Sequence, residues 1–297
     1  MAWQRTALVQ FEGKRAVISQ ITNALLRAIL VAGLVAAPSL LLPSTATDTA
    51  QLVVVLAILA SFMTFLEYYS RYPSIVEFRF APPFNRIKFI GLASTVLFLT
   101  VMLRGMVEPT GWSVFLWHLG GGLGEAIDFP YSPVRLVVLM LPVNSDAQLV
   151  ASVRTAAGLS YTMSILMIFV FITAVRLFGW PLRHGAFNVW VNLPLFDPTA
   201  GGDVLYRLKR DAALNIVLGS LLPFLIPAAI KAAADLIDPI SIAHPQTLIW
   251  TMTAWAFLPA SMLMRGIAMS RIAEMIEEKR KRTYARAEAE AEALHRA

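Results

Sequence analysis

The sequence predicts an all-α integral membrane protein, a bundle of six transmembrane helices with two long cytoplasmic loops and both chain ends in the cytoplasm. The first observation is composition: 57% of the 297 residues are hydrophobic and only 15% are charged, against about 45–50% and about 25% in soluble domains. The second is that the apolar residues form blocks of about 20, the length of a helix that crosses ~30 Å of hydrocarbon. The third is the uneven distribution of the basic residues along the chain.

Six apolar blocks are long enough to serve as membrane spans. The predicted spans are residues 22–43, 50–69, 89–106, 156–175, 212–231 and 247–264. Together they form one transmembrane domain, residues 22–264. We expect the first block to remain in the protein as a span, because it is too long for the apolar region of a cleavable signal peptide.

The segments on either side of this domain carry more charge. Residues 1–21 mix apolar and basic side chains, which fits either an interfacial amphipathic helix or a solvated terminus. Residues 265–297 are predicted to continue the last span as a charged cytoplasmic helix. Two oppositely charged pairs four residues apart support that helix: Glu277 with Lys281, and Glu278 with Arg282.

The distribution of basic residues predicts the orientation. With the N-terminus in the cytoplasm, 20 of the 25 Lys and Arg residues lie on the cytoplasmic side. The outer side receives Arg104, Arg135, Arg154 and Lys231, and Arg27 lies just inside the first span. Because Lys and Arg accumulate in cytoplasmic loops, both termini are predicted to be cytoplasmic. The excess of Arg over Lys, with abundant Ala, is associated with high-GC bacterial genomes, so we expect a bacterial inner membrane.

Several classes of site lack the residues they need. The chain has no cysteine, which excludes disulfides, thiolate metal sites and cysteine nucleophiles. The four histidines are scattered, and the sequence contains no HExxH motif, no P-loop and no complete GxGxxG. We therefore predict no catalytic residue, no cofactor and no metal ligand. The basic residues behind the net charge of +6 are distributed as membrane topology requires. Nucleic acid is therefore not an expected partner.

The two cytoplasmic loops share a layout that suggests a contact surface. Residues 76–80 and 187–193 each alternate in polarity, a strand-like period, and each run is followed by proline and phenylalanine. The loops either pair as a small sheet or bind a partner strand, or they are unrelated interfacial loops. Candidate residues for contact with a partner or lipid are Glu67, Arg71, Glu77, Arg79, Arg86, Trp190, Asp197 and Asp203. We expect Glu67 to pair with Arg71, and Asp203 to be the N-cap of the next helix.

Residues 107–148 contain two apolar runs that are each too short to cross the membrane. Two structures fit: interfacial helices lying on the membrane, or a re-entrant hairpin buried in protein. Gly120 and Gly124 match GxxxG, but they lack the apolar 20-residue context in which that motif brings helices together.

The fifth span contains Pro223 and Pro227, four residues apart on one helix face. Each proline removes a backbone donor and frees a carbonyl one turn earlier. Freed carbonyls in a broken helix bind cations in some transporters. The alternative is a kink that neighbouring helices satisfy, and the lack of an acidic residue at mid-span favours this alternative.

Three functions remain as hypotheses. The first is a structural, accessory or assembly component of a larger membrane complex, in contact with lipid and with either a protein partner or a second copy. The second is a small-solute transporter or channel, suggested by the kinked fifth span. The third is an enzyme acting on lipid at the interface, for which the candidate residues would be Glu77, Arg79, Asp197 and Asp203.

Overall fold

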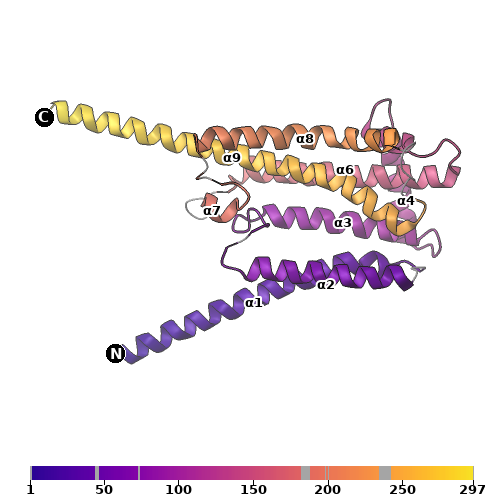
Figure 1. Cartoon of the computed structure of the whole chain (residues 1–297), viewed down its shortest axis with the longest axis horizontal. Helices are drawn as coiled ribbons and strands as arrows, with labels where there is room; N and C mark the ends of the chain where they lie inside the picture. The colour runs from indigo at the N-terminus through magenta and orange to yellow at the C-terminus, as the bar shows by residue number, and fades with distance from the viewer. Residues whose placement is uncertain are drawn as a thin grey trace.

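A computed structural model describes residues 2–43, 47–72, 74–181, 188–197, 199, 201–233 and 242–296. This part of the chain is all-helical and contains no strand (Figure 1). The helices are α1 (Ala2–Leu41), α2 (Thr47–Tyr69), α3 (Phe84–Arg104), α4 (Gly111–Ile127), α5 (Pro133–Leu139), α6 (Ala147–Leu177), α7 (Val189–Asn192), α8 (Val204–Ala233) and α9 (Pro245–Arg296).

Among the described residues, six helices are long and apolar enough to cross a membrane, which confirms the prediction of six spans. They are Ile18–Leu41 of α1, Ala50–Tyr69 of α2, α3, α6, α8 and α9. Several begin before the predicted boundary: α6 starts at Ala147 rather than at residue 156. Hydropathy detects only the apolar part of a helix, whereas the hydrogen-bonded helix continues into its polar ends.

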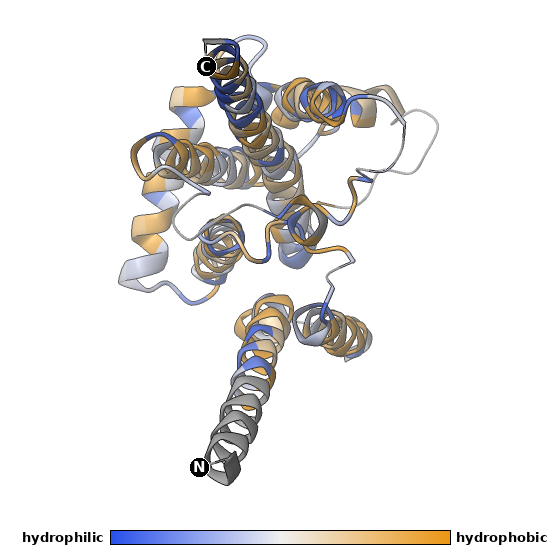
Figure 2. Ribbon diagram, turned by 90° about the vertical axis from the view of Figure 1, so that its left-hand side faces the viewer, coloured by the Kyte–Doolittle hydropathy of each residue, from blue (hydrophilic) through white to orange (hydrophobic). Residues whose placement is uncertain are grey.

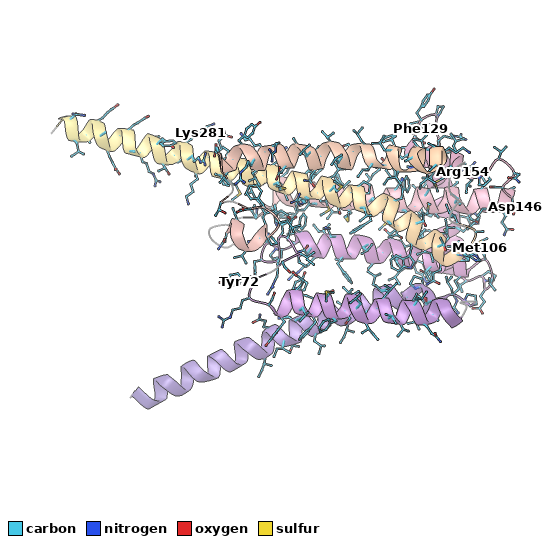
Figure 3. The ribbon with its side chains drawn as sticks, viewed as in Figure 1. Tyr72, Met106, Phe129, Asp146, Arg154 and Lys281 are labelled. Carbon is cyan, nitrogen blue, oxygen red and sulfur yellow. The ribbon has the colours of Figure 1, made fainter. Side chains whose placement is uncertain are left out.

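The long helices lie side by side, and both chain ends emerge from the same end of the bundle (Figure 1). Tyr72 and Lys281 lie at that end, whereas Met106, Asp146 and Arg154 lie at the other (Figure 3). The connections α2–α3, α6–α8 and the extension of α9 therefore share one end. We call it the loop end, and we call the opposite end, which carries α4 and α5, the α4 end.

Figure 2 separates the bundle into two parts. Helices α3, α6, α8 and α9 pack on one another, with α4 and α5 against α6, and form the body. Helices α1 and α2 form a hairpin that joins the body mainly through α1 and α3. Within the described part of the chain, α2 packs only against α1. The hairpin is therefore attached along one helix.

The body has two buried apolar clusters. The cluster at the α4 end includes Leu99, Val137, Val153, Ile249 and Met252. The cluster at the loop end includes Phe78, Phe84, Phe171, Trp180, Leu193, Phe196, Leu208, Met264 and Met269. The second cluster draws residues from both long loops as well as from α3, α6, α8 and α9, so the loops are part of the packed structure.

Helix α4 lies across the end of the bundle (Figures 1 and 2) and packs on α6 through glycines. A Cβ atom on Gly158 would lie 2.4 Å from the Cα of Gly124, and one on Gly124 would lie 2.7 Å from the Arg154 carbonyl oxygen. A Cβ on Gly120 would lie 2.9 Å from Thr155. The small-residue pattern at 120 and 124 thus produces a close helix crossing after all, because α6 supplies Gly158 opposite it.

Three charged residues fix α4 and α5 to α6. The carboxylate of Asp128, whose side chain is 6% exposed, lies 2.8 Å from Arg135 Nε and 2.9 Å from Arg154 Nε. Ser132 caps α5 by accepting a hydrogen bond from the Arg135 backbone N–H at 3.0 Å. The two arginines offset part of the desolvation of this buried carboxylate, and the three side chains link the α4–α5 connection to α5 and α6.

The described residues of the two alternating runs form no strand, and Phe187 lies outside the described part of the chain. Residues 77–80 form turns and residues 189–192 form α7. A strand would place alternate side chains on one face, yet Phe78 is fully buried whereas Phe80 is 55% exposed. Phe78 adopts φ 54°, a left-handed conformation that ends any extended run. The alternation over residues 76–80 arises because a single aromatic side chain is buried in a turn. The run is too short to indicate a strand.

Helix α9 continues beyond the body as a solvated extension (Figure 1). Residues 278–295 are all exposed, and we call this segment the arm. The pairs Lys281–Glu277 at 3.1 Å and Arg282–Glu278 at 3.7 Å follow the predicted four-residue spacing. Such pairs support a helix that has no apolar face to bury.

Candidate functional site

The two long loops meet around four aromatic side chains at the loop end. Phe78 and Phe84 have ring centroids 4.4 Å apart, and Trp180 lies 5.6 Å from Phe78. Phe171 of α6 contacts Phe84 and Trp180 edge-on, at 5.2 Å in each case. Edge-on and tilted contacts are the favoured arrangements of aromatic rings. The cluster joins the first loop, the second loop and α6 into one structure, which we call the loop cap.

Hydrogen bonds between the loops fix the loop cap. The Phe78 N–H donates to the Asn192 carbonyl at 2.6 Å, and the Phe80 N–H donates to Asn192 Oδ1 at 3.1 Å. Trp180 Nε1 donates to the Ala81 carbonyl at 3.0 Å. Asn192 and Trp180 are buried, so these bonds satisfy groups that water cannot reach. The loops therefore contact each other directly, but through a turn and a short helix.

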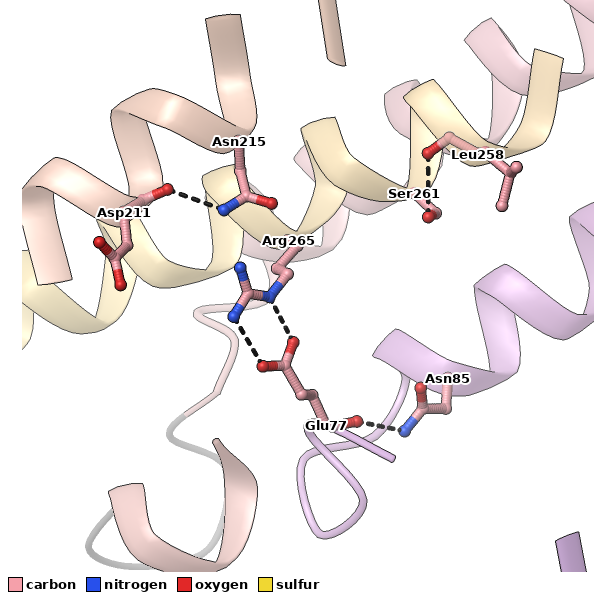
Figure 4. A network of polar contacts seen from close by, with 7 residues as sticks. All are labelled: Glu77, Asn85, Asp211, Asn215, Leu258, Ser261 and Arg265. Atoms are coloured by element: carbon pink, nitrogen blue, oxygen red, sulfur yellow. Dashed lines mark hydrogen bonds and ion pairs between the residues drawn. The ribbon is translucent and has the colours of Figure 1, made fainter. Parts of the chain in front are cut away.

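An ion pair lies beneath the loop cap (Figure 4). Arg265 of α9 donates from Nε and from a terminal nitrogen to the two carboxylate oxygens of Glu77, at 2.6 and 2.9 Å. The Glu77 side chain is 9% exposed and that of Arg265 is 24% exposed. Asn85 donates to the Glu77 carbonyl at 2.7 Å. A bidentate pair of this kind fixes orientation as well as charge, so it fastens the first loop to α9.

Lys88 of α3 adds a second cation beside this pair. Its Nζ lies 5.5 Å from the ring centroid of Phe84 and 6.0 Å from that of Phe257, within the range of a cation–π contact. The site thus holds one carboxylate and two cations. Because Arg265 contacts both carboxylate oxygens of Glu77, this side chain is part of the packing between the first loop and α9.

Ion pairs at the base of the arm connect α9 to α8. Lys209 Nζ lies 2.6 Å from a Glu277 carboxylate oxygen, and Arg280 donates to both oxygens of Asp203 at 2.9 and 3.2 Å. Asp203 also accepts a hydrogen bond from the Leu205 N–H at 3.1 Å, as an N-cap does. The hydrogen bond from Arg280 is the main reason why the pKa of Asp203 lies below its usual value. These contacts give the arm a fixed starting direction.

The expected pairing of Glu67 with Arg71 is absent from the described structure. Glu67 instead accepts hydrogen bonds from the Ser74 hydroxyl and from the backbone N–H groups of Ser74, Ile75 and Val76. Arg71 is exposed. Three adjacent backbone amides form a better site for a carboxylate than an exposed guanidinium. The amides are already ordered by the fold, whereas pairing with Arg71 would cost the conformational entropy of its side chain.

The remaining predicted residues are spread over separate contacts. Arg79 donates to the backbone carbonyls of Glu67 and Tyr68 at the end of α2. Arg86 is exposed, and Asp197 accepts bonds from the Thr199 N–H and hydroxyl in a local turn. The side chain of Trp190 lies outside the described residues. Within the described part of the chain, Glu77, Arg79, Asp197 and Asp203 thus take part in four separate sets of contacts.

The two prolines of α8 leave the helix continuous. Pro227 has no N–H, so the carbonyl of Pro223 lacks its usual helical donor. Trp255 Nε1 of α9 donates to that carbonyl at 3.0 Å in a buried contact. Of the two carbonyls that the prolines free, that of Pro223 therefore has a partner on a neighbouring helix.

Arg265, Lys209, Trp180 and Asn192 are the residues that sequence reasoning missed. One signal was present: Glu77 is an acid in a loop that is otherwise basic, and a buried acid requires a cationic partner. Within the described part of the chain, no three His, Asp or Glu side chains are grouped as metal ligands. Comparisons with protein-family models, curated proteins and solved structures found no match to this chain.

Proposed function

We propose that this protein is a membrane-anchored accessory component that uses the arm, residues 278–295, to hold a protein partner at the cytoplasmic surface of a bacterial inner membrane. The loop end is assigned to the cytoplasm because Lys and Arg are concentrated in its connections. The observation that carries the proposal is the arm itself, an exposed helix with a direction set by ion pairs at its base.

The charge order of the arm favours a protein over lipid as its target. Residues 279–286 are basic and residues 288–292 are acidic. The last predicted span ends at residue 264, so Lys279 lies roughly 20 Å farther along α9. Headgroups extend only about 5–8 Å beyond the hydrocarbon. The basic block therefore lies beyond the lipid surface, where its exposed cations can meet acidic side chains of a partner in addition to their pairs with Asp203, Glu277 and Glu278.

A second copy of this chain fits the arm poorly. Two copies in one membrane have the same orientation, so their arms would run parallel with basic block against basic block. Like charges that face each other are unfavourable. The expected partner is a different protein, with acidic groups near the membrane and basic groups farther out.

Site-specific photo-crosslinking in cells tests this proposal. A crosslinking residue at Ala289 should give a defined adduct with one other protein, and the charge inversion Lys281→Glu/Arg282→Glu should abolish it. The matched control is a crosslinker at Val143, which is fully exposed at the α4 end. Adducts at Ala289 that match those at Val143, or that contain only this chain, would contradict the proposal.

A further inference from the structure

A pocket of about 440 Å³ lies at the loop end, in the groove above α9 between α6 and α8. Helix α9 packs on both of these helices, whereas α6 and α8 do not pack on each other within the described part of the chain. The volume is within the roughly 300–1,000 Å³ typical of pockets for small ligands. The lining includes Arg176 of α6, Ile216 of α8, and Ile267, Ser270, Arg271 and Glu274 of α9.

The pocket lies where these helices leave the hydrocarbon. The predicted spans of α6 and α9 end at residues 175 and 264, close to the lining residues of each helix. Ile216 is at the same level, because a Cβ atom on Gly266 would lie 2.7 Å from its side chain. From Ile267 to Glu274 the lining of α9 runs toward the arm and changes from apolar to polar. The apolar part of the pocket therefore borders the hydrocarbon, and the polar part borders the headgroup layer.

Two arginines and one carboxylate line the polar part. Arg176 is in the last turn of α6 and is exposed. A terminal nitrogen of Arg271 lies 3.0 Å from a Glu274 carboxylate oxygen, and the Arg271 Nε is buried without a hydrogen-bond partner in the described part of the chain. Ser270 adds a hydroxyl group, which can donate or accept. Because Glu274 offsets only one guanidinium group, the described lining carries one net positive charge.

We infer that this pocket binds the headgroup of an anionic phospholipid, with its phosphate at Arg176 and Arg271 and its glycerol end against Ile216 and Ile267. Arginine is the side chain best suited to phosphate, because its planar N–H groups bind two oxygens at once. The net charge favours a headgroup with one negative charge over a zwitterionic one. A soluble phosphate ester would match the two arginines but would leave the apolar part without a partner.

Native mass spectrometry of the full-length protein, purified in mild detergent and supplied with phosphatidylglycerol or phosphatidylcholine, tests the inference. The wild type should retain one phosphatidylglycerol about fivefold more strongly than phosphatidylcholine, the factor expected from one net positive charge at a membrane surface. An equal concentration of glycerol phosphate, which has no acyl chain, should not displace it.

Two variants of exposed residues should shift retention of phosphatidylglycerol in opposite directions. Arg176→Gln makes the lining neutral and should remove the preference over phosphatidylcholine. Glu274→Gln raises the net charge and releases Arg271 from its ion pair, so it should increase retention of phosphatidylglycerol. A general loss of structure would not produce an increase, so the second variant separates binding from folding.

Matched controls separate the pocket from general effects of charge at the loop end. Arg86→Gln removes an exposed cation outside the lining and should leave the preference unchanged. Glu278→Gln removes a carboxylate one turn farther along α9, which is 56% exposed and paired with an arginine much as Glu274 is. Equal retention of the two lipids by the wild type, displacement by glycerol phosphate, or an equal increase for Glu278→Gln and Glu274→Gln would overturn the inference. The crosslinking at Ala289 does not depend on these results.

Discussion

The body and the hairpin are built from similar apolar helices but are held together in different ways. In the body, helices approach through glycines: a Cβ on Gly219 of α8 would lie 2.7 Å from the Pro259 carbonyl oxygen of α9, as Gly158 meets Gly124 farther along. In the hairpin, Gly33 has nothing within 4 Å of its Cβ position, and α2 packs only on α1 within the described residues. Apolar side chains alone give little preference for protein over lipid, so close backbone contact and polar links determine which helices stay together.

Valine at Gly158 should have the largest effect and would break the body. The added side chain cannot avoid the backbone of Gly124. We therefore expect the free energy of unfolding to fall by more than about 3 kcal/mol, or the protein to fail to accumulate. The measurement is the yield in membranes together with the thermal unfolding midpoint in detergent. Gly33→Val is the matched change in the hairpin and should have little effect. Equal losses for the two variants would show that the body is not packed more tightly than the hairpin.

Glu77→Gln should have the next largest effect, because it leaves Arg265 without its carboxylate. Removal of one partner from a buried pair costs about 3–5 kcal/mol, and we expect about 3 kcal/mol because Arg265 is 24% exposed. The control is Glu108→Gln, whose pair with Arg104 is on the surface with side chains 56% and 43% exposed. That change should cost under about 1 kcal/mol. Chemical unfolding of both variants in the same detergent would measure the difference.

The sequence predicted those parts of the molecule that are marked by the composition of long stretches of chain. The six spans and the continuation of α9 follow from apolar blocks and from charges four residues apart. The contacts that fix the body could not be found in this way. Gly158 faces Gly124 only because α4 turns across α6, and Trp255 meets Pro223 across 32 residues of chain. Both depend on how the helices are placed in space, which a periodic pattern does not encode.

In the loops, too, local sequence patterns failed to predict the contacts that the structure shows. Alternation over residues 76–80 allowed a strand as one alternative, whereas Phe78 packs inward against Phe84 and Trp180. Glu67 was expected to form an interfacial ion pair with Arg71. The turn at residues 74–76 instead offers backbone amides to the carboxylate. In both cases tertiary contacts override the local pattern, and only the acidic character of Glu67 and Glu77 indicated that partners were needed.

Trp255→Phe should have a smaller effect than the two changes above and tests a single polar contact within the body. It keeps an aromatic ring between α8 and α9 but removes the donor to the Pro223 carbonyl. A buried carbonyl left without a donor costs about 1–3 kcal/mol. The unfolding free energy in detergent should fall by that amount. Trp112→Phe provides the control, because Trp112 is 74% exposed and its loss should leave the value unchanged.

The smallest expected effect concerns the link between the body and the arm and depends on pH. The pKa of Asp203 is lowered, chiefly by the hydrogen bond from Arg280. Because the folded protein holds the proton less tightly than the unfolded chain, the link is at full strength above the ordinary pKa of 3.8 and weakens as the pH falls through the lower folded value.

Spin labels at Tyr206 of α8 and Ala287 of the arm would measure this change as a distance distribution. The distribution should be narrow at neutral pH and should broaden only below the ordinary carboxyl pKa of 3.8, because the folded pKa of Asp203 is lower still. Asp203→Asn should give the broad distribution at neutral pH, whereas Asp211→Asn, which changes a charge nearby on α8, should keep it narrow. If Asp203→Asn stayed as narrow as the wild type, the continuous helix α9 and the pair of Lys209 with Glu277 would be setting the direction of the arm without Asp203.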